Sequence, residues 1–195
     1  PAGNAILGNQ IHANGLLGID LGAPGVNPNR YQPGPSRIEQ RPAIPPAVNY
    51  GQNAPILFFA SIAGTGQSSV VEGSLLNWPN HAFRIQIFVN DTADVSGYGE
   101  GRSLVGSQVI TTNDTGYAWF EIPASPLLWG QLVTATATDA QNNTSEFSAV
   151  LPVGVKTRHF GEGFVVNTTI AGIPLHWPGG NGSYAISPSI SNPAF

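Results

Sequence analysis

The sequence predicts an all-β fold built around one antiparallel β-sandwich. Short segments rich in Val, Ile, Phe and Thr recur along the chain between turn residues, a pattern typical of strands rather than helices. The chain has 195 residues, enough for one ordinary core with attachments. Its 24 glycines and 17 prolines predict many turns, and its 41% of hydrophobic residues excludes a disordered or collagen-like chain.

The strand pattern is clearest between residues 54 and 153. Phe83, Ile85, Ile87 and Val89 alternate onto one face of their strand, and in residues 132–138 the threonines take the face expected to meet solvent. Seven strands in roughly 100 residues favour an immunoglobulin-like sandwich. The predicted strands are Ile56–Ala63, Ser69–Leu76, Ala82–Asn90, Ser103–Thr112, Tyr117–Ile122, Gln131–Asp139 and Glu146–Val153.

Residues 1–22 predict a different element, a single coil of a β-solenoid. Asn4, Asn9 and Asn14 recur at five-residue spacing, with aliphatic residues between them and glycines at the bends. One such coil leaves its backbone edges unpaired and its aliphatic side chains uncovered. We therefore expect residues 1–22 to need a partner.

Two further segments complete the predicted organisation. Residues 23–53 are rich in proline and predict an extended strap, with Arg30, Arg37 and Arg41 solvated or paired with carboxylates. Residues 154–195 form a C-terminal extension with a strand-like stretch and no evident sheet of its own.

Composition excludes several classes of partner and chemistry. The net charge is −4 and only 9% of residues are charged, so no basic surface for nucleic acid is expected. No apolar run is long enough to span a membrane. The absence of Cys excludes disulfides and thiolate sites, and the absence of Met predicts that a leader was removed or that the chain derives from a longer one. Abundant Asn, Thr, Ser and Gly favour an extracellular or cell-surface location.

Four stretches carry a resemblance to a known family. They are GNQIHANGLLGIDLG at 8–22, FRIQIFVN at 83–90, SGYGEGRSLVGSQVITT at 96–112 and VTATATDAQNNTSEFS at 133–148. Together they resemble the C-terminal part of bacterial secreted and surface proteins with right-handed parallel β-helix repeats, in which the last coil precedes an immunoglobulin-like sandwich. The resemblance implies a spacer or surface-display role without an assigned reaction.

A second likeness concerns the tail. IPLHWPGGNGSYAIS at 173–187 is similar to the short leading strand of matrixin-type zinc metalloproteases. The His-Glu-x-x-His helix of that family is missing, so the likeness implies no zinc site.

Catalytic patterns are not found. No Gly-x-Ser-x-Gly elbow occurs, and His12, His81, His159 and His176 lie in four separate segments. We therefore expect a protein that is not an enzyme and that needs no cofactor, with calcium as the one exception considered.

Candidate calcium ligands lie in two loops. Asp91, Asp94 and Glu100 follow one strand, and Asp139 and Glu146 bracket a turn, so each loop offers the oxygen ligands that Ca²⁺ prefers. The favoured alternative is that Asp91 and Asp139 cap turns by accepting backbone N–H groups.

Tryptophans offer a second candidate site. Trp78 and Trp129 adjoin turns and are the expected surface residues for stacking on carbohydrate, whereas Trp119 lies within a strand and is expected to be packed or partly packed. Structural packing of these rings is the favoured alternative to carbohydrate contact.

The two apolar ends predict an extracellular structural subunit that assembles with copies of itself by β-strand addition, giving a filament or surface lattice. One alternative is an accessory module of a larger secreted protein that binds carbohydrate or a cell surface, and another is a piece of a secreted enzyme whose active centre lies elsewhere. The residues expected to make the assembly contacts are Ile6, Ile11, Ile19, Leu21, Phe164, Val166 and Ile170.

Overall fold

The computed structural model describes residues 2–29, 48–64, 66–154, 157–160 and 164–167. These residues fall into two compact units, the first ending at Gly154 and the second beginning at Val155. The strands of the first unit are β1 (Ile56–Ala60), β2 (Ser69–Leu76), β3 (Ala82–Asn90), β4 (Ser103–Thr111), β5 (Tyr117–Ala124), β6 (Leu132–Asp139) and β7 (Leu151–Pro152).

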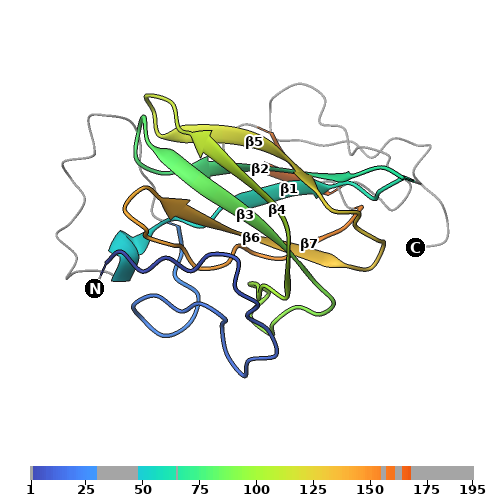
Figure 1. Cartoon of the computed structure of the whole chain (residues 1–195), viewed down its shortest axis with the longest axis horizontal. Helices are drawn as coiled ribbons and strands as arrows, with labels where there is room; N and C mark the ends of the chain where they lie inside the picture. The colour runs from blue at the N-terminus through green and yellow to red at the C-terminus, as the bar shows by residue number, and fades with distance from the viewer. Residues whose placement is uncertain (1, 30–47, 65, 155–156, 161–163, 168–195) are drawn as a thin grey trace. The chain divides into compact units, whose positions relative to one another are not determined.

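The first unit is a sandwich of two antiparallel sheets (Figure 1). One sheet has the order β1-β2-β5 and the other has the order β4-β3-β6-β7. The prediction of an all-β fold with two antiparallel sheets is confirmed. The expected strand Glu146–Val153 is reduced to Leu151–Pro152, because the residues before it follow β6 through single backbone bonds such as that from the Ser145 N–H to the Ala137 carbonyl.

The main core lies between the two sheets. Alternation places one face of each strand in this core, as β5 shows with its regular succession of exposed and buried residues. The predicted core face of β3 is confirmed for Phe83, Ile85 and Ile87, which are fully buried. The largest fully buried apolar side chains are Phe83, Phe88, Leu75, Ile85, Ile87, Ile122 and Leu127.

The expectation of a solvent-facing row of threonines on β6 is wrong. Thr134, Thr136 and Thr138 are all buried, because other parts of the chain cover the outer face of their sheet. The Thr134 hydroxyl donates to the Glu100 carbonyl, and the Thr138 hydroxyl shares a hydrogen bond with that of Thr144. Sheet β4-β3-β6-β7 is therefore covered on both faces along β6.

The N-terminal segment, residues 2–29, supplies part of this cover (Figure 1, blue). It contains no strand and makes a single β-bridge, between Ile11 and Gly101, so a solenoid coil is not observed there. A short 3-10 turn, Val48–Gly51, brings the chain back to the sandwich, and within it Asn49 and Tyr50 have left-handed φ angles of 48° and 52°.

The second unit contains a two-stranded sheet, in which β8 (Thr157–Phe160) pairs antiparallel with β9 (Phe164–Asn167). The expectation that the tail has no sheet of its own is thus corrected for these residues. Most of the predicted strap, Ile170 and the 173–187 stretch lie outside the described residues.

Candidate functional site

The four N-terminal residues expected to contact other copies instead pack within the chain. Ile19 is buried against Phe88 and Phe147, and these two rings meet edge to face with centroids 5.4 Å apart. Partly buried side chains surround this small cluster; they are Ile6, Ile11 and Leu21. The expectation that the aliphatic residues of the segment are uncovered is therefore wrong for these four, because the outer side of β3 and the 146–148 loop provide an apolar surface for them, while Leu7 and Leu16 are exposed.

Polar side chains of the sandwich hold the backbone of the same segment. The Glu100 carboxylate accepts the N–H groups of Ala13 and Asn14 at 2.7 and 2.9 Å. Gln86 accepts the N–H of Gly8, and Thr144 accepts that of Ile6. The sandwich thus holds the segment mainly through side chains. Among the described residues, the segment forms one β-bridge with it, between Ile11 and Gly101.

Glu146 makes the most extensive of these contacts. Its Oε1 accepts the Leu21 N–H at 2.9 Å and the Asn27 Nδ2 group at 2.8 Å, while Oε2 accepts the Asn27 N–H at 3.0 Å. Glu146 also lines a cavity of about 830 Å³ between the N-terminal segment, residues 48–57 and the 146–150 loop. Both carboxylate oxygens are occupied by donors of the chain itself.

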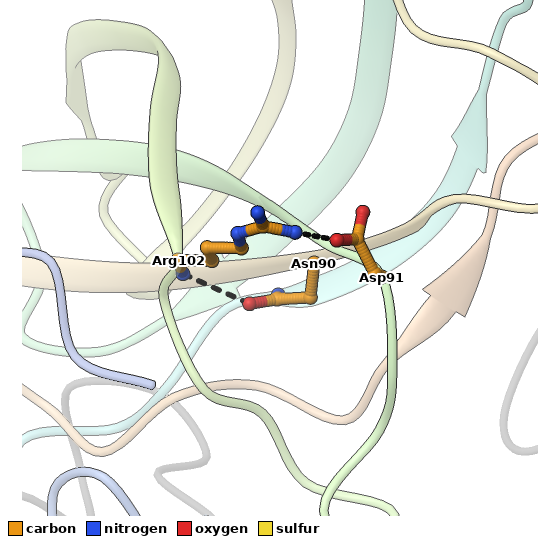
Figure 2. A network of polar contacts seen from close by, with 3 residues as sticks. All are labelled: Asn90, Asp91 and Arg102. Carbon is orange, nitrogen blue, oxygen red and sulfur yellow. Dashed lines mark hydrogen bonds and ion pairs between the residues drawn. The ribbon is translucent and has the colours of Figure 1, made fainter. Parts of the chain in front are cut away.

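Asp91 was predicted to cap a turn, but it forms an ion pair with Arg102 instead (Figure 2). The Arg102 N–H donates to Asn90 Oδ1 at 2.9 Å, which ties the end of β3 to the start of β4. Both charged side chains are half exposed, so the pair contributes little stability by itself.

Asp139 and Asp94 have the capping role expected of acidic turn residues. Asp139 Oδ1 accepts the N–H groups of Gln141 and Asn143, as predicted. Asp94 Oδ1 accepts the Ser96 N–H at 2.8 Å. Hydrogen bonding by the Ser96 hydroxyl, followed by its N–H, lowers the pKa of Asp94 from 3.8.

The candidate calcium ligands Asp91, Asp94, Glu100, Asp139 and Glu146 are not assembled into a site. Across residues 2–154, apart from the undescribed strap and residue 65, no three His, Asp or Glu side chains are grouped to hold a metal ion. Each carboxylate instead has a structural partner within the chain.

The tryptophans differ from the prediction in one of three cases. Trp78 is partly buried against the main core, so its proposed surface role is corrected. Trp119 stacks on Phe58 with ring centroids 5.2 Å apart, yet it remains 48% exposed on the outer face of sheet β1-β2-β5. Trp129 is 63% exposed, as predicted.

Trp129 is held in place at a tight turn. The Gln131 N–H donates to the Leu128 carbonyl, and the Gln131 side chain accepts the Leu128 N–H. The Trp129 ring lies over Gly154, where a Cβ atom would come within 2.9 Å of the ring. The lack of a side chain at Gly154 thus lets an exposed aromatic ring pack closely on the backbone.

Sequence reasoning missed the sheet edges, and the structure makes three of the four poor pairing sites. Strand β7 has two residues, one of them Pro152. The β1 edge is covered where the Gly154 N–H donates to the Ala60 carbonyl. Strand β5 carries Glu121 and Pro123, a charge and a missing N–H, both of which discourage pairing with another strand.

Strand β4 is the fourth edge, and it is covered at one end only. Its nine residues, SLVGSQVIT, include no charge and no proline. At one end the Ser125 N–H donates to the Val105 carbonyl, while Ser107, Val109 and Thr111 are exposed. Edge strands of this kind are templates for pairing with another strand.

The ladder pattern shows which β4 groups point outward. The bond from the Thr112 N–H to the His81 carbonyl marks that pair as hydrogen-bonded, and antiparallel pairs alternate between bonded and non-bonded types. With the register Phe83↔Ile110 and Arg84↔Val109, the N–H and C=O groups of Ser107, Val109 and Thr111 point away from β3. These three residues form the open edge.

No protein-family model matches the chain, and no curated protein matches it. Among the described residues no helix is long and apolar enough to cross a membrane. The interpretation of function therefore depends on the residues and contacts described above.

Proposed function

We propose that the chain is a non-enzymatic, extracellular structural subunit that associates with copies of itself by β-strand addition. The observation that carries this proposal is the open β4 edge, three outward-pointing residues on a strand without charge or proline. The sandwich of two antiparallel sheets and the resemblance to β-helix surface proteins are compatible with such a role.

The structure changes which part of the chain makes the proposed contact. The N-terminal segment is engaged by Glu100, Glu146 and the Phe147 cluster of its own sandwich, so it is a poor donor to a neighbour. Among the described residues, strand β4 has no such partner at its three outward positions, and its side chains place no charge on an approaching strand.

The proposal is tested by the association state of the full chain. Sedimentation velocity and light scattering across a range of concentrations should show reversible association. Val109→Lys should shift the chain to monomer, because it adds a charge at the centre of the open edge while altering an exposed side chain. Val95→Lys, at a fully exposed loop position, is the matched control and should associate like the wild type.

A second variant separates the edge from general effects of charge. Val109→Pro removes only an N–H that points away from β3, so the sandwich keeps its own ladder. Wild-type protein that stays monomeric at the highest soluble concentration would overturn the proposal.

A second candidate function is a carbohydrate-binding accessory module, favoured by the closely packed and exposed ring of Trp129. A glycan array probed with the full chain should give signals that Trp129→Ala removes and Trp119→Ala retains. An array without any signal would exclude this candidate.

A further inference from the structure

The open edge of β4 also restricts which partner it fits and with what symmetry. This step rests on the proposed function, since it assumes that copies of the chain associate. Of the four edges of the sandwich, β4 is the long one without charge or proline, and among the described residues no main-chain bond reaches the outward groups of Ser107, Val109 and Thr111. Between two sandwiches, the edge that best fits this one is therefore the same edge of the second copy.

We infer that two copies pair β4 with β4 in an antiparallel, two-fold symmetric register centred on Val109. In this register Val109 lies opposite Val109 of the second copy, and Ser107 lies opposite Thr111. All outward groups of the three residues are then used, because three bonded pairs with two bonds each give about six main-chain hydrogen bonds. If the two-fold axis does not pass through Val109, at least one of Ser107, Val109 and Thr111 on each strand no longer lies opposite one of these three residues in the other copy.

Composition supports a second copy as the occupant. Since β4 has no charged residue, juxtaposing two copies brings no like charges directly opposite each other along the strand. The half-exposed Val109 side chains become a cross-strand apolar pair at the two-fold axis. The four-stranded sheets of both copies then join into one continuous sheet.

The symmetry has a consequence for assembly. A contact in which the same patch is used by both subunits is closed after two copies, whereas a filament needs two different patches. The β4 contact therefore predicts a dimer and not the filament or lattice expected from the sequence. Pairing of β4 with β8 or β9 of another copy is the competing arrangement, and it would not close.

Cysteine cross-linking tests the register directly, because the chain has no native cysteine. Opposed residues in a bonded antiparallel pair have Cα atoms about 5.5 Å apart, within the range of about 4.4–6.8 Å found in disulfides. Val109→Cys should cross-link to itself under mild oxidation. Ser107→Cys and Thr111→Cys should each cross-link poorly alone and efficiently when the two variants are mixed.

Val95→Cys, on an exposed loop, reports the rate of collisional cross-linking and is the control. Association without the Val109→Cys cross-link, or with efficient self-linking of Ser107→Cys, would overturn the register while leaving self-association intact. Association beyond a dimer that Val109→Lys does not affect would overturn the two-fold contact. A wild-type chain that never associates would overturn the proposed function together with this inference.

Discussion

The side-chain amide of Asn49 binds the backbone of Asn4 as a neighbouring strand would. Asn49 Oδ1 accepts the Asn4 N–H at 3.1 Å, and Asn49 Nδ2 donates to the Asn4 carbonyl at 3.0 Å. The same Nδ2 group donates to the Thr144 carbonyl at 2.9 Å. Asn49 is fully buried, so one side chain joins the N-terminal segment, the returning strap and the loop after β6.

Asn49→Gly should therefore lower the free energy of unfolding by about 2 kcal/mol, because it leaves buried backbone groups without partners. Glycine tolerates the left-handed φ of this position, so the loss reports the amide and not backbone strain. Urea denaturation measures the change. Asn9→Ala, at an exposed position of the same segment, should change the midpoint little.

Gly101→Ala should destabilise the fold by about 1–3 kcal/mol, as expected for overpacking. A Cβ atom there would lie 2.6 Å from two ring atoms of Phe147, so the ring would have to move and disturb its contact with Phe88. Gly15→Ala is the matched control, because a Cβ atom at Gly15 meets nothing within 4 Å. Equal thermal midpoints for the two variants would contradict the packing described for Phe147.

Glu146→Gln should weaken the attachment of residues 21–27 and cost about 1–3 kcal/mol. The new NH₂ group must face at least one of the donors that the carboxylate now accepts, since both oxygens are occupied. Hydrogen exchange should show faster exchange at the Leu21 and Asn27 amides. Glu121→Gln, on the exposed side of β5, should leave these amides unchanged.

The pKa of Asp94 should be measurably below 3.8 in the folded chain. Because the folded pKa is lowered, the stabilisation from Asp94 is fully present above pH 3.8 and is lost as the pH falls through the folded pKa. NMR titration of the carboxyl carbon gives the value directly. Ser96→Ala should raise the pKa toward 3.8, because it removes the hydroxyl that favours the carboxylate.

Strand positions could be predicted from the sequence because apolar and polar residues alternate every second position along a strand. Alternation in β3 and β5 identifies their buried faces, and turn residues mark where the strands end. The same reasoning failed for Thr134, Thr136 and Thr138, because a polar row indicates solvent only where nothing else covers it. The cover comes partly from residues more than a hundred positions away, to which local periodicity is insensitive.

The site residues show the same limit. Asp139 was predicted as a turn cap from its immediate neighbours, and that prediction is confirmed. Glu100 and Glu146 looked like calcium ligands, because their true partners, the N–H groups of Ala13 and Leu21, are distant in sequence. Strand β4 is an edge because of the order of strands in its sheet, and this order cannot be read from the sequence of one strand.

The attachment of the N-terminal segment sets an order of events during folding. The bond from the Gly3 N–H to Asn143 Oδ1 joins residues separated by 140 positions, and that from Ile6 to Thr144 joins residues separated by 138. The segment is synthesised before the sandwich, but its binding surface is complete only after the strand β6 and its following loop have been synthesised. Such distant contacts form slowly because a long loop must close before they are made. The N-terminal segment is thus among the last parts of this unit to reach its native position, and the Phe88 and Phe147 rings stay uncovered until it does.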